Sequence, residues 1–112
     1  MPHFLIEGSY SPEGLRGLAK DKASGREAAI KTALKAIGGK LVGLYFALGE
    51  ADVYAVCECP DYVTAAAMSL AASSSGLIRT KTIPLMTVAE TDKALGMEIS
   101  FRSPGTDKAA KA

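Results

Sequence analysis

The order of apolar and polar residues predicts a strand followed by a long helix in the first third of the chain. Residues 3–10 form a short apolar segment, and Ser11 and Pro12 follow it, residue types that cap a helix and fit its first turn. The helical pattern continues to Ile37, with an interruption expected at Ser24-Gly25. Its second half has apolar residues at i, i+3, i+4 and i+7 spacing, so one face is suited to burial. The glycine pair that follows ends the helix.

The remaining pattern predicts a hairpin, a second helix, a strand and a short last helix. Two β-prone runs, 40–48 and 53–59, are joined by GEAD, a short glycine-containing connection typical of a hairpin. An alanine-rich helix follows Pro60-Asp61 and ends at a glycine. Residues 77–86 are expected to be extended. The letters TVAE at 87–90 match a capping box, which begins a short helix.

This order of strand, helix, strand, strand, helix, strand predicts an α+β domain of the ferredoxin-like class. In a βαββαβ fold, right-handed crossovers place both helices on one face of a four-stranded antiparallel sheet. A chain of 112 residues is near the common size of one domain. We expect the ferredoxin-like domain over residues 1–96, including the short C-terminal helix. Residues 97–112 have little to bury and are expected to form a flexible C-terminal tail.

Apolar residues occur on both faces of the predicted sheet, so the face without helices should need a cover. On the second strand, alternation groups Leu41, Tyr45 and Ala47 against Val42, Leu44, Phe46 and Leu48. A second copy of the chain would supply the cover, and we expect a homodimer or higher oligomer through the sheet face. The alternative is that Tyr45 and Tyr54 lie singly in water, as scattered exposed apolar groups do.

Charge and composition argue against several classes of partner. The chain has 13 lysines and arginines against 12 acids and no basic stripe, so nucleic acid is not expected. The apolar runs are shorter than the roughly 20 residues of a membrane span, and the first residues lack the pattern of a secretory signal. We therefore expect a cytoplasmic protein with no membrane partner. Cys57 and Cys59 are expected to be buried free thiols. His3 is the one histidine in the sequence, so too few ligands are present for a metal, and no metal or cofactor is expected.

Two acidic residues, Glu50 and Asp52, interrupt the apolar stretch YFALGEADVYAV. Asp52 follows the hairpin connection, where aspartate often accepts a hydrogen bond from a nearby backbone amide, and we expect it to hold the turn. Two carboxylates this close can act as an acid/base pair only where water is excluded, and turns are usually wet.

A better candidate site lies on the face of the sheet without helices. The first strand would place His3, Leu5, Glu7 and Ser9 there, and the third strand would add polar groups between apolar walls, a composition that suits a small-molecule pocket. Arg79 could pair with Glu7 or Glu58 or hold an anionic ligand, because alternation alone does not choose its face. No catalytic residue is assigned. The candidate ligand-binding residues are Glu7, Tyr45, Asp52, Tyr54, Glu58 and Arg79.

Three segments resemble the GYD family, small bacterial and archaeal proteins named for a glycine-tyrosine-aspartate signature. They are PHFLIEGSYSPEGLRGL, GGKLVGLYFALGEADVYAVCECPD and AAAMSLAASSSGLIRTKTIPLMTVAE, together about residues 3–95. In the signature region Gly49 and Asp52 match, and Ala51 stands where the tyrosine is common. The resemblance implies a ferredoxin-like domain similar to those of the dimeric α/β barrels, with no settled biochemical activity.

Three functions remain open. We favour a homo-oligomeric module that binds a small apolar or aromatic ligand between the sheet and its cover, for sensing or sequestration. The second is a cofactor-independent enzyme resembling the small monooxygenases and lyases of the dimeric α/β barrels, with Asp52, Tyr54 or Glu58 as acid/base groups. The third is a purely structural subunit whose sheet faces hold an assembly together.

Overall fold

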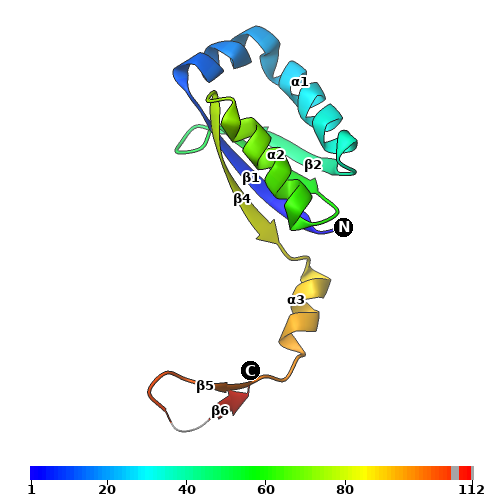
Figure 1. Ribbon diagram of the computed structural model, residues 1–112, viewed down its shortest axis with the longest axis vertical. Helices are drawn as coiled ribbons and strands as arrows, with labels where there is room; N and C mark the ends of the chain where they lie inside the picture. Colours follow the sequence, from blue (N-terminus) through cyan, green and yellow to red (C-terminus); the bar gives the residue numbers. More distant parts are fainter. Residues whose placement is uncertain (107–108, 112) are drawn as a thin grey trace.

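The computed structural model describes residues 1–106 and the backbone of 109–111. Figure 1 shows the elements in chain order. The main domain contains β1 (His3–Tyr10), α1 (Pro12–Ala36), β2 (Lys40–Phe46), β3 (Val53–Glu58), α2 (Tyr62–Ser74) and β4 (Ile78–Leu85). It is followed by α3 (Val88–Leu95), β5 (Ser100–Arg102) and β6 (Ala109–Lys111). None of the described helices is long and apolar enough to cross a membrane.

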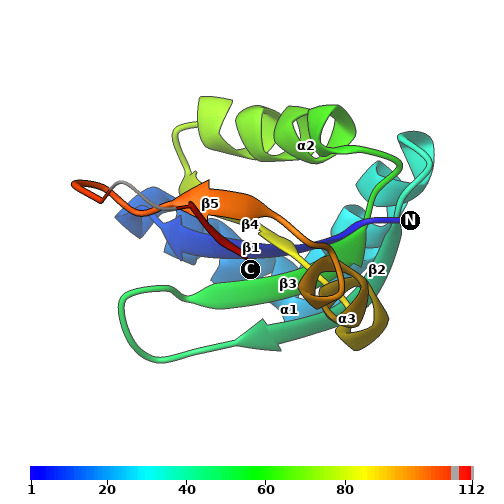
Figure 2. The same cartoon turned by 90° about the horizontal axis from the view of Figure 1, so that it is seen from below.

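The first four strands form one antiparallel sheet in the order β2-β3-β1-β4. Side chains from α1 and α2 pack against the same core cluster, so both helices cover one face of this sheet, and Figure 2 shows α2 lying over the strands. The predicted ferredoxin-like fold is therefore confirmed. The opposite face, which we call the open face, has no helix on it.

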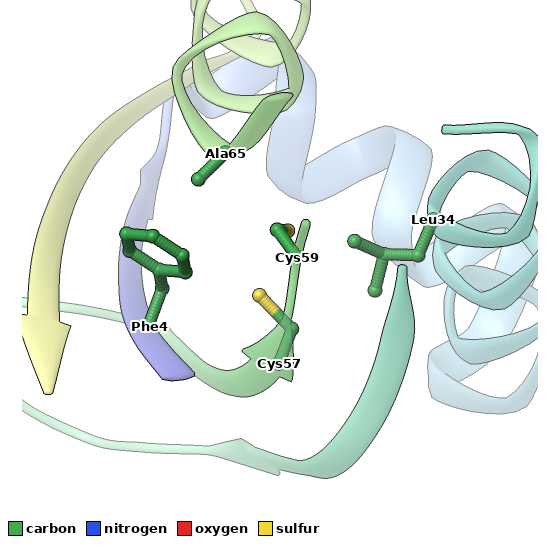
Figure 3. Close-up of a cluster of buried hydrophobic side chains, with 5 residues drawn as sticks. All are labelled: Phe4, Leu34, Cys57, Cys59 and Ala65. Carbon is green, nitrogen blue, oxygen red and sulfur yellow. The ribbon is translucent and has the colours of Figure 1, made fainter. Parts of the chain in front are cut away.

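The core is small and is centred on two cysteines. Phe4, Leu34, Cys57, Cys59 and Ala65 are buried together, and they come from both helices and from the strands and loop beneath them (Figure 3). The two cysteines are free thiols, as the sequence predicts. Burial raises the pKa of Cys57 to about 12 and also raises the pKa of Cys59. Both thiols are thus protonated at neutral pH and pack as small apolar side chains.

Local signals in the sequence account for the helix starts. Ser11 Oγ accepts a hydrogen bond from the Gly14 amide at 3.0 Å, and Pro12 occupies the first turn of α1. At α2, Asp61 Oδ1 accepts from the Thr64 amide at 2.8 Å within a capping box. The interruption of α1 occurs at Lys22, where φ is 68° and ψ is 161°, and not at Ser24-Gly25. The interruption was predicted at the glycine because glycine weakens helices, but Gly25 remains helical.

An irregularity in β2 changes which of its residues share a face. Leu41 lies opposite Cys57, but the next paired residue is Gly43, opposite Val56, so Val42 is an extra residue in a β-bulge. Leu41 therefore packs against the core, whereas Gly43 and Tyr45 lie on the open face. The prediction from strict alternation that Leu41 and Tyr45 share a face is wrong, because the bulge shifts the alternation by one residue.

The chain beyond β4 leaves the domain. The capping box at Thr87 forms as predicted, with the Thr87 amide donating to Glu90 Oε1 at 2.8 Å and the Glu90 amide donating to Thr87 Oγ1 at 3.1 Å. The β5–β6 hairpin that follows α3 was not expected from the sequence, which predicts a tail without regular structure. Residues 107, 108 and 112 of that tail lie outside the described residues, and its flexibility stays a prediction.

Candidate functional site

The strand register places most of the candidate residues on the open face. Glu7 lies opposite Tyr54 on β3 and opposite Lys81 on β4, and Tyr54 in turn lies opposite Tyr45. These residues form one row across the sheet because directly opposed residues share a face. Arg79 lies opposite Ser9, so it belongs to the open face as well, which alternation alone did not decide.

Part of this set lines an open depression of about 260 Å³. Glu7, Tyr54 and Arg79 come together there with Lys81 and Glu50. The Ser9 hydroxyl donates to the Glu50 carbonyl oxygen at 2.9 Å, which holds the hairpin loop against β1. Acidic and basic side chains balance in this depression, but exposed charges of this kind contribute little binding energy individually.

Asp52 makes a structural bond rather than lining the depression. Its Oδ2 accepts a hydrogen bond from the Tyr10 amide at 2.8 Å. Its own amide donates to the Gly8 carbonyl oxygen, and its carbonyl oxygen accepts from the Ala47 amide, both at 2.8 Å. Asp52 thus ties the β2–β3 connection to the end of β1. The sequence predicts a bond to a nearby amide, but the amide it actually accepts from lies far away in the sequence.

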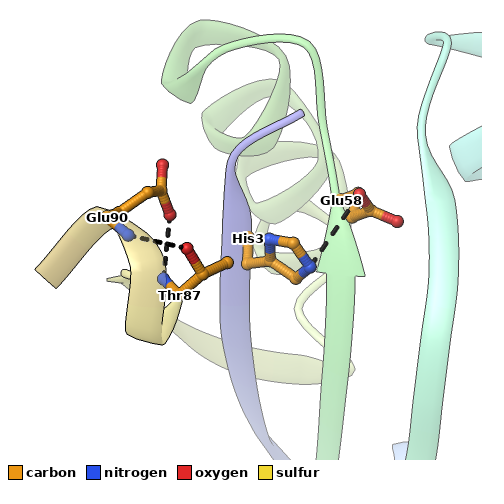
Figure 4. Close-up of polar contacts among 4 residues, drawn as sticks. All are labelled: His3, Glu58, Thr87 and Glu90. Atoms are coloured by element: carbon orange, nitrogen blue, oxygen red, sulfur yellow. Dashed lines mark hydrogen bonds and ion pairs between the residues drawn. The ribbon is translucent and has the colours of Figure 1, made fainter. Parts of the chain in front are cut away.

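Glu58 lies at the other end of the open face. Its Oε1 is 3.8 Å from His3 Nε2, and Figure 4 shows the pair on neighbouring strands. Glu58 is opposite His3, and Arg79 is opposite Ser9, six residues along β1. At about 3.3 Å per residue this separation is on the order of 20 Å. A pair between Arg79 and Glu58, one of the options left by the sequence, is therefore excluded within one chain.

Tyr45 is an exposed candidate residue on β2. A Cβ placed on Gly43 would lie 3.3 Å from Tyr45 Cε2, so the ring lies against the glycine backbone two residues earlier. The side chain is 70% exposed. An aromatic ring held this openly is available to a partner on the open face.

A second hollow, which sequence reasoning missed, lies on the helix side of the sheet. It is a cavity of about 90 Å³ between the strands and both helices. The sheet contributes apolar side chains from β1, β2 and β3, and the helices contribute others from α1 and α2. The main apolar lining residues are Ile6, Leu44, Val53, Ala55, Ile30 and Met68. The small side chains of Ala55 and Ala72 could have indicated a space on the helix side of the sheet. That both face this space is known only from the tertiary structure.

The course of α1 explains why this space is not filled. Within α1 only Gly14 and Leu34, near its two ends, are buried. The kink at Lys22 separates them, and the first half of α1 rises away from α2 in Figure 1. A groove of about 260 Å³ adjoins the cavity at this place. The two hollows share Tyr10, Arg26, Ala72 and Ile78, so Ala72 stands at their junction.

The serine and threonine hydroxyls beside the cavity are already bonded. Ser73 Oγ and Thr80 Oγ1 are 2.7 Å apart, and Thr80 Oγ1 also donates to the Ser69 carbonyl oxygen at 3.2 Å. The Ser69 and Thr82 hydroxyls form a further bond between α2 and β4. The ionisable side chain beside the mouth is Arg26, whose Nη1 is 3.9 Å from Asp21 Oδ2. The arrangement suits an apolar group inside and a polar group at the mouth.

Among the described residues, no group of three or more histidine, cysteine, aspartate or glutamate side chains could hold a metal ion. Comparison with family models matches residues 4–95 to the GYD domain. Comparisons with curated proteins and with solved structures found no match.

Proposed function

The chain belongs to the GYD family, and we propose that it works as a homo-oligomeric module that binds a small apolar or aromatic molecule between the sheet and its helices. The observation that carries this proposal is the apolar cavity of about 90 Å³. Small-molecule sites are concave and lined mostly by apolar side chains, and this hollow has such a lining. The ligand position differs from the sequence-based hypothesis, which placed it on the open face.

The dimensions of the two hollows indicate what kind of ligand fits. A cavity of about 150 Å³ accepts benzene, so the present cavity takes a group somewhat smaller than a benzene ring, or the end of a longer molecule. The rest of such a molecule would lie in the adjoining groove. Arg26 lines both hollows, and an anionic head group there would replace Asp21, which also lines the groove, as its partner. A short-chain carboxylate combines these features.

Binding is favoured over catalysis because the candidate acid/base groups are elsewhere. Asp52 bonds to the Tyr10 amide, and Tyr54 and Glu58 belong to the open face. Cys57 lines the cavity, but burial raises its pKa to about 12, so its thiol is a poor nucleophile. The cavity therefore contains no reactive group that would support the enzyme hypothesis.

A titration followed by NMR tests the ligand site. Xenon, which is smaller than benzene, probes the cavity, and hexanoate probes the cavity and the groove together. Both should shift the methyl signals of Ile30, Leu34 and Met68. Arg26→Gln should weaken hexanoate binding several-fold and leave xenon binding unchanged, since only hexanoate has a charge for Arg26 to meet.

A cavity-filling variant with a matched control decides whether the shifts come from this site. Ala72→Leu places a larger side chain at the junction of the two hollows, and Ala71→Leu places the same side chain at the neighbouring exposed position. Binding should be lost in Ala72→Leu and kept in Ala71→Leu. Wild-type protein without shifts at the lining methyls, or shifts that persist in Ala72→Leu, would contradict the proposal.

Self-association is the second part of the proposed function. The middle row of the open face contains Val56, Leu5 and Ile83 side by side, an apolar strip between the charged rows. We expect a second copy to cover it. Tyr45→Glu should release monomers in sedimentation velocity. Tyr62→Glu is the control, because Tyr62 is 77% exposed and belongs to α2, away from the open face. Equal behaviour of the two variants would argue against this interface.

A further inference from the structure

The C-terminal arm, residues 86–102, extends the molecule far beyond its domain. The radius of gyration is 18.1 Å and the extents are 60 × 29 × 23 Å. A compact chain of this length has a radius of gyration of about 13 Å. Figure 1 shows α3 and β5 leading away from the end of β4, and β5 pairs with β6 rather than with a strand of the main sheet. The arm therefore lacks the burial that normally holds a segment in place.

The arm nevertheless has the residue pattern of a segment that packs on an apolar surface. Val88 and Leu95 lie on one side of α3 at i, i+7 spacing. In the chain after α3, Met97, Ile99 and Phe101 alternate with polar residues, which is typical of a half-buried strand. Six large apolar side chains of the arm are each more than half exposed: Met86, Val88, Leu95, Met97, Ile99 and Phe101.

We propose that the arm of each chain packs against the open face of a second copy, so that two chains exchange their arms. The inference rests on the self-association part of the proposed function, and not on ligand binding in the cavity. The arm carries exposed apolar side chains, and the open face has an apolar strip of Leu5, Val56 and Ile83 between its charged rows. The capping box at Thr87 begins α3 two residues after β4 ends and directs the arm outward, away from its own sheet.

The arms of two copies together offer enough area for a stable dimer. A fully exposed side chain of these types presents roughly 60–120 Å² of apolar surface. The six together then offer on the order of 350 Å², and docking one arm on any partner would bury about twice that. With the polar surface buried beside it, this apolar area is near the roughly 1,000 Å² of total area expected of a specific interface. A two-fold exchange repeats the contact and reaches about 1,400 Å², which is the usual size.

Sedimentation velocity on two full-length variants tests the exchange. Leu95→Glu places a charge in the apolar stripe of α3, and Lys93→Ala, on the opposite side of the helix, is the control because it lowers the net charge by the same amount. Both positions are exposed, so neither substitution threatens the fold of the domain. Wild type and Lys93→Ala should be dimers, and Leu95→Glu should dissociate at least tenfold more readily.

Cross-linking then shows to which chain the arm is docked. An equal mixture of unlabelled and ¹⁵N-labelled protein is equilibrated and treated with an amine-reactive cross-linker. Lys93 in the arm should link to Lys40 or Lys81 of the open face in peptides of mixed isotope composition.

Each alternative outcome has a defined meaning. A monomeric wild type, or links found only in peptides of a single isotope composition, would overturn the exchange. A dimer that survives Leu95→Glu but is lost in Tyr45→Glu would show that the sheet faces associate without the arms. In that case the self-association in the proposed function stands and this inference fails.

Discussion

The hydrogen bond between Asp52 and the Tyr10 amide should contribute measurably to stability. It is a charge-assisted bond of 2.8 Å in a partly buried position, and it joins the β2–β3 connection to the last residue of β1. Asp52→Ala removes the acceptor and leaves the Tyr10 amide without this partner. Bonds to charged groups contribute about 1.5–3 kcal/mol, and partial exposure places this one near the lower end. We therefore expect a loss of about 1.5–2 kcal/mol.

Urea unfolding at neutral pH, with melting temperature as a second readout, measures this effect. For a domain of this size, 1 kcal/mol corresponds to a shift of about 4–5 °C, so Asp52→Ala should melt roughly 6–10 °C lower. Asp52→Asn retains an oxygen acceptor and should lose only about half as much. Glu50→Ala is the control, because Glu50 is an exposed acid in the same loop.

Two results would refute this reasoning. If Asp52→Ala is as stable as Glu50→Ala, the bond to Tyr10 contributes nothing to folding. If Asp52→Asn remains fully stable but abolishes a turnover found for this protein, the carboxylate has a chemical role and the structural account is wrong. A changed dependence of the unfolding free energy on urea would indicate an altered unfolded state, and the comparison would then be made from melting temperatures.

Three further predictions follow from close contacts and shifted pKa values. Gly14→Ala should destabilise the protein by more than about 2 kcal/mol, because the new Cβ would overlap the Leu77 carbonyl oxygen, whereas Gly17→Ala has open space and should be neutral or stabilising in thermal unfolding. Alkylation of Cys57 by iodoacetamide at pH 8 should be about 1,000-fold slower in native protein than in urea, since burial raises its pKa from 9.0 to about 12; equal rates would contradict this. The bond from the Thr87 amide lowers the pKa of Glu90. The ionised Glu90 side chain therefore stabilises the start of α3 above the ordinary glutamate pKa, and this stabilisation is lost as pH falls through the lowered pKa. An NMR titration should show that midpoint below the ordinary one, and Thr87→Ala, which keeps the amide but removes the hydroxyl that also lowers this pKa, should move it part of the way back upward.

The element order and the faces of two strands could be predicted from local patterns. Ser11, Asp61 and Thr87 each bond the amide three residues ahead, so their effect is contained in a few neighbouring letters. On β1 and β3 no irregularity occurs, and simple alternation correctly placed Glu7 and Tyr54 on the open face. The same rule failed on β2, because the bulge at Val42 depends on pairing with β3.

The candidate site could be predicted only in part, for the same reason. The sequence brought Glu7, Tyr54 and Arg79 together as candidates, and they do line one depression. The sequence pattern could not show that Glu58 lies apart from these residues. Alternation gives the face of a residue, whereas its position along the strand depends on the pairing register. The binding role of all six candidate residues stays a prediction.

By itself the sequence determined what neighbouring residues can settle: the helix caps, the strands and their order, two thiols suited to burial, and membership of a family of ferredoxin-like domains. The tertiary structure decided what depends on residues far apart in the chain. The Asp52 bond reaches an amide on another strand, and the cavity exists because α1 bends at Lys22 and leaves space beside α2. Such features result from how whole elements pack against each other, and a void appears in no local pattern of residues.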